Sequence, residues 1–325
     1  MTLGRLSQAA ITDRLRGEGL LLQTGPFTFR LKSPHALVAQ GLVQLYADVR
    51  LADDNDFIDF SLTVGHGAGL RRWLRPQARF VFDGHPVFEP LPADQAYPLL
   101  EWAMNWCISA HAHQYLIVHA AVVERQGCAL ILPAPPGSGK STLCAALVHS
   151  GWRLLSDELT LVSLADGQVW PLCRPVSLKN ASIEVIHRFA PAAEFNRVTH
   201  DTAKGSITHM RVPAAHLAQV DVAARPRWLV YPRYEAGADM TLVRRSRASA
   251  VVDLARNAFN FGLLGETGFD VLASLVQSCD CYDFRYSHLE QALAAFDALA
   301  KSAAMAPVHG TEAAVHANAD VLSVS

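Results

Sequence analysis

The order of apolar and polar residues along the chain predicts both strands and helices. Apolar runs of strand length occur at residues 115–124 and 129–132, and a third run, at 152–162, is interrupted by Asp157-Glu158. Residues 94–110 repeat apolar side chains at helical spacing, and residues 143–149 form a short apolar helix that ends before a glycine. This mixture indicates an α/β fold.

Residues 1–112 predict a small N-terminal α+β domain. Helical segments are predicted near residues 1–18, 34–46 and 94–110, and strands near 27–31, 57–64 and 78–82. The segment 27–31 alternates like an edge strand, and Asp83-Gly84 is a hairpin turn signal. We predict that this domain contacts the rest of the chain through helix 94–110. Trp102 and Trp106 on that helix fit either buried packing or a ligand stack.

Residues 113–300 predict one larger domain. Beyond residue 164, strands are predicted near 169–172, 228–231 and 239–243, and helices near 182–187, 247–264, 268–278 and 289–299. Residues 190–211 predict a loop in which Lys204 and Arg211 are candidates to contact a phosphate, with plain surface charge as the alternative. Residues 301–325 are rich in alanine and small polar residues, which predicts a disordered tail.

The stretch CALILPAPPGSGKST, from Cys128 to Thr142, has the order strand, glycine-rich loop and helix. This order is typical of the phosphate-binding P-loop, G-x-x-x-x-G-K-[ST], with alanine here in place of the first glycine. Free N–H groups of the loop and of the first helical turn attract phosphate. The predicted nucleotide-binding residues are Ala134, Gly137, Ser138, Gly139, Lys140, Ser141 and Thr142.

Two of these residues have further predicted roles. Lys140 should be exposed toward the β- and γ-phosphates, and the Ser141 hydroxyl can ligate Mg²⁺. An ordinary Pro/Gly loop between a strand and a helix is the alternative interpretation.

Asp157 and Glu158 interrupt the strand at 152–162, one short helix after the loop. The short connection predicts that this strand lies beside the loop's own strand, joined by a right-handed crossover. Asp157 would then lie at the carboxyl edge of the sheet, where it could ligate Mg²⁺ or take a proton from an attacking hydroxyl. Alternation along the strand predicts that Glu158 points the opposite way. A solvated strand end is the alternative for both residues.

His119 lies on the strand predicted at 115–124. Gln126-Gly127 predicts a two-residue hairpin turn that pairs residues symmetrically about it. That register places His119 opposite Ala134, so an imidazole is predicted beside the phosphate site. A core histidine that bonds a backbone carbonyl is the alternative.

Composition narrows the class of protein. The chain has 325 residues, a length sufficient for two domains, and half of its residues are hydrophobic. Its net charge of −2 gives no sign of a nucleic-acid partner. Its six cysteines lie in apolar contexts, which indicates buried thiols in a reducing compartment. The sequence contains neither a signal peptide nor an apolar run of about 18 residues, so we predict a cytoplasmic protein without a membrane partner.

Three features together resemble the HPr kinase/phosphorylase family: the strand residue His119, the loop ending Gly139-Lys140-Ser141, and the acidic pair Asp157-Glu158. This resemblance covers about residues 115–165. The chain more closely resembles the HPr kinase-related kinase A group over most of residues 20–298, through stretches such as LEWAMNWC, HAAVVER and RPVSLKN. The resemblance implies a P-loop kinase core of the HPr kinase/PEP carboxykinase type.

The resemblance also implies an ATP-dependent kinase that phosphorylates a serine hydroxyl of a protein or peptide. Asp157 would be the base, His119 would tune it, and Lys140 would bind phosphate. ATP and Mg²⁺ are the implied cofactors, a homo-oligomer is the implied assembly, and the candidate metal ligands are Ser141, Asp157 and Glu158. RPVSLKN lacks the glutamate that true family members carry in that region. A small-molecule hydroxyl kinase, a simple ATPase, and an ATP-binding regulatory module with little transfer activity remain alternatives.

Overall fold

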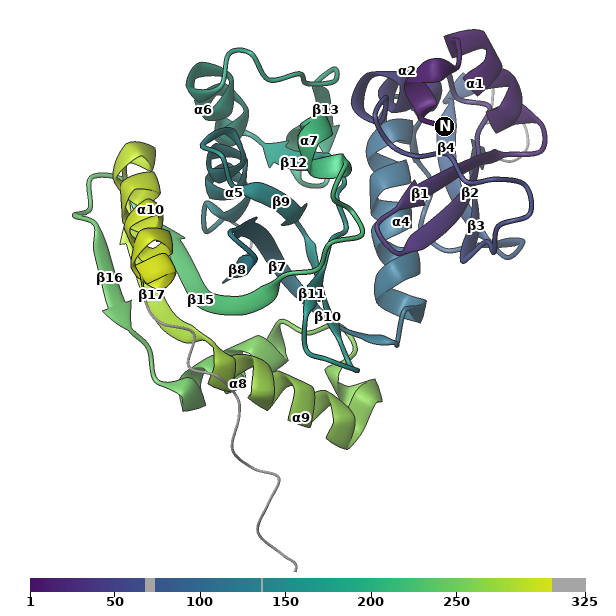
Figure 1. Cartoon of the computed structure of the whole chain (residues 1–325). Helices are drawn as coiled ribbons and strands as arrows, with labels where there is room; N and C mark the ends of the chain where they lie inside the picture. Colours follow the sequence, from purple (N-terminus) through teal and green to yellow (C-terminus); the bar gives the residue numbers. More distant parts are fainter. Residues whose placement is uncertain (68–73, 136, 306–325) are drawn as a thin grey trace, which may run out of the picture.

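The chain folds into a mixed α/β structure with three β-sheets, as the computed structural model shows for residues 1–67, 74–135 and 137–305 (Figure 1). The N-terminal sheet, in purple and blue, lies to one side of a larger central sheet. Helix α4 (Ala96–His111) packs on the N-terminal sheet and also reaches the central region, where Asn105 bonds Glu158. The described residues contain no helix that is both long and apolar enough to cross a membrane.

The N-terminal sheet has the strand order β1-β2-β3-β4-β5, with β6 also pairing β4. Its strands are β1 (Leu20–Thr24), β2 (Phe27–Lys32), β3 (Phe60–His66), β4 (Gln77–Phe82), β5 (His85–Pro86) and β6 (Leu91–Pro92). Its helical segments are η1 (Leu3–Arg5), α1 (Gln8–Arg16), α2 (Ala36–Leu45), η2 (Ala93–Gln95) and α4. The strand predicted at 27–31 forms as β2, but its predicted edge position is wrong, because β2 pairs with both β1 and β3.

The central sheet has the strand order β11-β10-β7-β8-β15-β17-β16, with β9 also pairing β7. Its strands are β7 (Tyr115–Arg125), β8 (Cys128–Pro133), β9 (Arg153–Ser156), β10 (Leu159–Ser163), β11 (Val169–Trp170), β15 (Arg225–Tyr234), β16 (Thr241–Arg244) and β17 (Asp280–Tyr286). Strands β8, β15 and β17 run parallel. The sequence pattern predicts no strand at β17, which nevertheless completes this parallel set.

Separate apolar cores cover the two faces of the central sheet. Ile117 and Ala121 of β7 join a core with α5 and α10, whereas Val118 and Ala120 join a second core with α8 and α9. These helices are α5 (Lys140–His149), α8 (Arg247–Arg256), α9 (Phe261–Ser278) and α10 (Leu289–Met305). Because side chains alternate along a strand, His119 lies on the face covered by α5.

The hairpin predicted at Gln126-Gly127 is confirmed. β7 and β8 pair antiparallel in the predicted register, from Arg125 with Cys128 to Ala120 with Pro133. Gln126 and Gly127 both have positive φ angles, 55° and 76°, as a type I′ turn requires.

The strand predicted at 152–162 lies beside β7 and not beside β8, which corrects the predicted crossover. Both β9 and β10 pair antiparallel with β7, while β8 has β7 and β15 as neighbours. The hairpin already places β7 on that side of β8, so the next strand takes the position one further out. The predicted interruption is confirmed, because β9 ends at Ser156 and β10 begins at Leu159.

A small third sheet, in the order β12-β14-β13, takes two of its strands from the loop predicted at 190–211, which corrects that prediction in part. Its strands are β12 (Val176–Lys179), β13 (Thr199–Thr202) and β14 (Gly205–Met210), and helices α6 (Ala181–Phe189) and α7 (Ala214–Leu217) flank it in the sequence. The apolar pattern did not predict these strands, because threonine, serine and histidine side chains occupy most positions of β13 and β14. Lys204 lies in the turn between these two strands.

The C-terminal helix is longer than predicted. Helix α10 continues to Met305, so residues 301–305 of the predicted disordered tail are helical. The rest of that predicted tail, 306–325, lies outside the described residues. All six cysteines are free thiols, and five of them are buried.

Candidate functional site

A tightly turned loop joins β8 to α5. Gly137 and Gly139 both have a φ angle of 85°, which strains any residue that carries a side chain. A Cβ on Gly139 would come within 2.5 Å of the Tyr286 hydroxyl oxygen. That hydroxyl donates a hydrogen bond to the Gly139 carbonyl at 3.2 Å, so β17 packs directly against the loop. Ala134, at the position of the first glycine, is 1% exposed.

Helix α5 begins at Lys140, with Ser141 and Thr142 in its first turn. Lys140 is only 8% exposed, so the prediction of an exposed lysine is wrong. Its Nζ and the Ser138 Oγ are both buried without a hydrogen-bond partner. Burial lowers the pKa of Lys140, and the nearby Asp157 opposes that shift. A buried, unpaired ammonium beside a helix N-terminus fits an anionic ligand.

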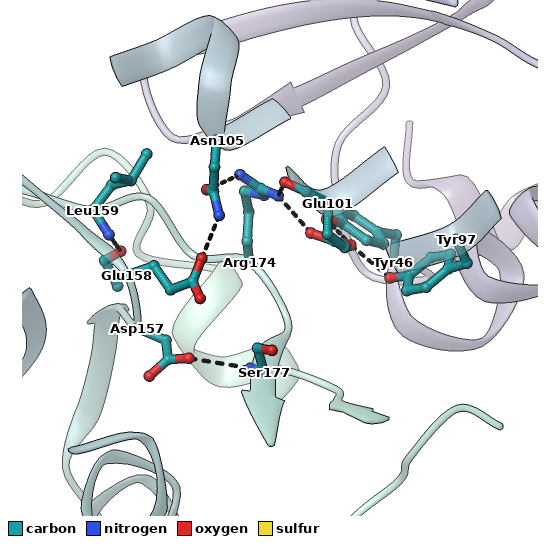
Figure 2. Close-up of polar contacts among 10 residues, drawn as sticks. Tyr46, Tyr97, Glu101, Asn105, Asp157, Glu158, Leu159, Arg174 and Ser177 are labelled. Atoms are coloured by element: carbon teal, nitrogen blue, oxygen red, sulfur yellow. Dashed lines mark hydrogen bonds and ion pairs between the residues drawn. The ribbon is translucent and has the colours of Figure 1, made fainter. Parts of the chain in front are cut away.

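Asp157 lies in the break between β9 and β10. The Ser156 Oγ bridges this break by accepting a hydrogen bond from the Leu159 N–H at 3.2 Å. The Asp157 Oδ2 accepts a hydrogen bond from the Ser177 N–H at 3.1 Å, whereas its Oδ1 has no partner (Figure 2). Burial, followed by the charge of Glu158, raises the pKa of Asp157 to about 6. The carboxyl group therefore changes protonation state close to neutral pH.

Glu158 lies on the same side as Asp157, which corrects the predicted opposite orientation. Both residues line one pocket, since the strand is broken at this point and strand alternation does not apply. Glu158 accepts a hydrogen bond from the Asn105 Nδ2 at 2.5 Å (Figure 2). Its carboxylate also lies 3.5 Å from the Lys179 Nζ. Burial acts to raise the pKa of Glu158, but the charges of neighbouring lysines outweigh burial and lower it to about 2.

Three lysines, Lys140, Lys179 and Lys204, are close enough to Glu158 to lower its pKa. The Lys204 Nζ lies 5.2 Å from the ring centroid of Trp102, so the turn of the third sheet reaches helix α4. Lys179 is not among the residues predicted for the site, although it belongs to the quoted stretch RPVSLKN. Three positive charges around two carboxylates favour the binding of a polyanion.

His119 is neutral at neutral pH. Burial and then the charge of Lys140 lower the pKa of His119 to about 4, so its imidazole lies within electrostatic reach of the loop lysine. The His119 backbone N–H donates to the Asn257 carbonyl at 2.7 Å, and its ring lies 5.8 Å from the Phe259 ring.

Arg211 is not brought together with the other predicted site residues. Its guanidinium forms two ion pairs of 2.7 Å, one with Asp48 and one with Glu194. Arg211 therefore links Asp48, which follows α2, to the segment beside the third sheet, and it does not belong to the candidate phosphate site.

A buried polar network that the sequence reasoning missed lies behind the two carboxylates (Figure 2). Arg174 donates to the Asn105 Oδ1 at 2.6 Å and to the Glu101 Oε2 at 2.5 Å. The hydroxyls of Tyr46 and Tyr97 donate to the Glu101 Oε1 at 2.8 and 2.6 Å. The sequence signal for this network was the pair of stretches LEWAMNWC and RPVSLKN, which carry Glu101, Asn105 and Arg174. Helix α4 thus connects the N-terminal sheet to Glu158 through Asn105.

A comparison with models of protein families shows a similarity in this part of the chain. Residues 97–172 match the family described as SynChlorMet cassette protein ScmC. A search of curated proteins gives no significant match. The matched stretch is less than a quarter of the chain, yet it runs from helix α4 through the hairpin, the loop and α5 to the two carboxylates. The similarity to that family is therefore concentrated on the candidate site.

Proposed function

We propose that the chain is an ATP-dependent kinase that transfers the γ-phosphate to a hydroxyl group. We further propose that residues 113–300 form a P-loop kinase core of the HPr kinase/PEP carboxykinase type. The observation that carries the proposal is the unpartnered, buried ammonium of Lys140, which follows a glycine loop and interacts electrostatically with Asp157. A phosphate-binding cation and a carboxyl group of raised pKa are the two groups that this transfer needs.

The loop and helix α5 fit the phosphates of ATP. Gly137 and Gly139 give the loop φ angles of 85° that side chains disfavour, and Lys140 supplies a cation without a protein hydrogen-bond partner. Ser141, Asp157 and Glu158 would hold Mg²⁺, which when bound neutralises negative charge on the phosphates. Asp157 has one free oxygen, Oδ1, which can either ligate Mg²⁺ or take a proton, and we assign it the second role.

Asp157 fits the role of general base. In the transfer, the acceptor oxygen bonds to the γ-phosphorus, the bond from phosphorus to the ADP oxygen breaks, and the hydroxyl proton moves to Asp157. A carboxyl pKa of about 6 leaves Asp157 ionised at neutral pH but more basic than an ordinary aspartate. Lys179 and Lys204 add positive charge close to the transferred group. The resemblance described above favours a serine hydroxyl of a protein or peptide as acceptor.

The first prediction concerns Asp157 in the transfer reaction. We expect Asp157→Asn to retain ATP binding but to lower phosphate transfer by roughly 10²-fold or more, the usual effect of losing a general base. The measurement is transfer of label from γ-labelled ATP into a native lysate, followed by identification of the labelled acceptor. Lys140→Ala is the matched control, because it should lose productive ATP binding itself. Transfer by Asp157→Asn at the parent rate, with saturating ATP and Mg²⁺, would show that another group activates the acceptor.

One observation favours a second candidate, an ATP-binding regulatory module with little transfer activity. Glu158 is already paired with Lys179 and bonded to Asn105, which reduces its capacity to bind a metal ion. This candidate predicts nucleotide binding without label transfer to any acceptor, so the same labelling experiment separates the two functions.

A further inference from the structure

The glycine loop has different neighbours on its two sides. Strand β8, which leads into the loop, lies between β7 and β15 in the central sheet (Figure 1). Asp157 lies on the β7 side, in the break between the two strands that pair with β7. On the other side, Tyr234 at the end of β15 and Tyr286 at the end of β17 bond the loop. A linear ligand with one end at Asp157 would therefore point its other end toward these two tyrosines.

The distance between the two sides of the loop suits a nucleotide. Three strand spacings separate the broken strand of Asp157 from β15, in the order β10-β7-β8-β15. At about 4.8 Å for each spacing, the separation is roughly 14 Å. An extended nucleoside triphosphate has a similar length from its γ-phosphate to its base. With the γ-phosphate beside Asp157, the base would reach the carboxyl end of β15.

Tyr234 is an exposed aromatic residue at this end of the sheet. It is the last residue of β15, an interior strand, yet it is 49% exposed, whereas Tyr286, its partner on β17, is 1% exposed. Its N–H donates to the Ser138 carbonyl at 2.9 Å, and its Cβ would lie 2.9 Å from a Cβ added to Gly139. An aromatic surface is therefore open to solvent directly beside the loop.

Other aromatic rings support the ring of Tyr234. Its centroid lies 5.7 Å from that of Tyr286, and the two planes meet at 71°. Tyr286 in turn stacks on Phe284, with centroids 5.2 Å apart and planes at 12°, and Phe284 packs against Phe296 of α10. Because these contacts restrict the ring before any ligand arrives, a base that stacks on it loses little entropy by ordering it.

The connection from β15 to β16, residues 235–240, borders the exposed ring. It crosses the end of β17, where the Glu235 N–H donates to the Tyr286 carbonyl at 3.0 Å. The Ser287 hydroxyl donates to the Ala238 carbonyl at 2.8 Å, which fixes the connection at a second point. The connection is thus held in place without covering the ring.

Phe259 is a second exposed aromatic residue near the site, but it lies on the β7 side. It is 52% exposed, its N–H donates to the Ile117 carbonyl of β7, and its ring lies 5.8 Å from the His119 ring. A base on Phe259 would lie on the same side of β8 as Asp157, and the γ-phosphate would then point away from Asp157. The positions of the two rings therefore favour Tyr234.

We propose that Tyr234 is the platform on which the nucleotide base stacks, and that this residue lets the chain distinguish a nucleotide from inorganic phosphates. This inference rests on the proposed kinase function and adds a subsite for the base at the carboxyl end of β15. An aromatic side chain stacks on a base through its π-face, so the ring itself, and not the tyrosine hydroxyl, supplies the affinity.

The test is isothermal titration calorimetry of the full chain in the presence of Mg²⁺. The probes are β,γ-imido-ATP, which is not hydrolysed, and inorganic tripolyphosphate, which carries phosphates without ribose or base. Tyr234→Leu removes the aromatic face but keeps an apolar side chain, whereas Tyr234→Phe removes the hydroxyl alone. We expect Tyr234→Leu to weaken binding of the ATP analogue about tenfold and to leave binding of tripolyphosphate unchanged. Tyr234→Phe should bind both probes as the parent does.

Phe259→Leu is the matched control, because it removes an equally exposed ring on the other side of the loop and should change neither affinity. Equal weakening of both probes in Tyr234→Leu would overturn the inference, because the ring would then only support the loop. Unchanged binding of the ATP analogue in Tyr234→Leu would overturn it as well, and so would a loss in Tyr234→Phe as large as in Tyr234→Leu. Failure of the parent chain to bind either probe would instead refute the proposed kinase function.

Discussion

Asp157 has two carboxylate oxygens with different surroundings. Its Oδ2 is fixed by the Ser177 N–H, and its Oδ1 is buried but free of partners. The fixed oxygen orients the carboxyl group, and the free oxygen is available to a ligand. Burial raises the pKa of Asp157 to about 6 but lowers the pKa of His119 to about 4. Of these two groups, Asp157 is therefore the one that titrates near the physiological range.

The second prediction is that transfer activity falls as the pH drops through about 6, because protonated Asp157 cannot accept the hydroxyl proton. His119→Gln should leave the midpoint of this fall unchanged, because His119 is already neutral there. The measurement is the initial transfer rate at saturating ATP between pH 5 and 8. Loss of the acidic fall in His119→Gln would assign the titration to the histidine.

The third prediction concerns the stability effect of the same carboxyl group. The raised pKa of Asp157 means that the folded chain binds its proton more tightly than the unfolded chain, where the pKa is near 3.8. This contribution to stability is present below the unfolded pKa and is lost as the pH rises through about 6. We therefore expect Asp157→Asn to be more stable than the parent at pH 8, by up to about 3 kcal/mol, and nearly equal to it at pH 4. Urea unfolding at both pH values measures the difference, and a pH-independent difference would contradict the assignment.

At the scale of elements, the loop between β8 and α5 is fixed by its contact with the end of β17. The Gly139 carbonyl accepts from the Tyr286 hydroxyl, and the Ser138 carbonyl accepts from the Tyr234 N–H at 2.9 Å. The ends of parallel strands β15 and β17 therefore hold the loop from one side. Ligands bind at this carboxyl edge in open α/β sheets, so the loop is held in the place where phosphates would bind.

The fourth prediction is that Gly139→Ala disrupts the loop. The new Cβ would lie 2.5 Å from the Tyr286 hydroxyl oxygen and 2.9 Å from the Tyr234 Cβ, at a φ of 85°. We expect ATP affinity to fall at least tenfold, measured by calorimetry. Gly127→Ala is the control, because its φ is 76° but no atom lies within 4 Å of the added Cβ. It should cost about 1 kcal/mol of stability through backbone strain and leave ATP affinity unchanged. Equal ATP affinity in both variants would show that the contact with β17 is unimportant.

At the scale of the whole molecule, helix α4, which packs on the N-terminal sheet, is joined to the candidate site by a buried ion pair. Arg174 and Glu101 are 7% and 5% exposed at their side chains, and their charged groups lie 2.5 Å apart. Asn105 continues this network to Glu158, so displacement of helix α4 would also displace a carboxylate of the site. The apolar core also joins the two parts of the chain, because one cluster of buried side chains contains residues from Leu3 to Ala300.

The fifth prediction is that breaking this pair destabilises the entire chain. Arg174→Met leaves the Glu101 carboxylate buried without its cation, and we expect a loss of about 3–5 kcal/mol in urea unfolding. Adding Glu101→Gln should restore part of that loss, since the uncompensated charge is removed. The control is Asp221→Asn, which breaks the exposed pair with Arg50, where the side chains are 50% and 62% exposed, and should cost less than about 1 kcal/mol. Similar losses for the buried and exposed pairs would refute a central role for the network.

Local sequence determined the features that depend on neighbouring residues. The turn at Gln126-Gly127 set the register of β7 and β8, since two consecutive positive φ angles leave little choice of hairpin. The interruption at Asp157-Glu158 and the start of α5 after the glycine loop were also predictable, because both depend on residues that are adjacent in the sequence. From these local signals alone, the loop and the acidic pair could be named as parts of one site.

Only the tertiary structure decided which elements lie side by side. β17 and the strands of the third sheet have weak apolar patterns of their own, and their pairing depends on partners far away in the sequence. The break in the strand turned Glu158 to the same side as Asp157, against simple alternation. Arg211 forms ion pairs with Asp48 and Glu194, away from the site, whereas Lys179 pairs with Glu158 inside it. Both residues are basic, so their charge in the sequence does not show which of them joins the site. Charge pairing and the burial of Lys140 and Asp157 arise from long-range packing, which a linear pattern does not encode.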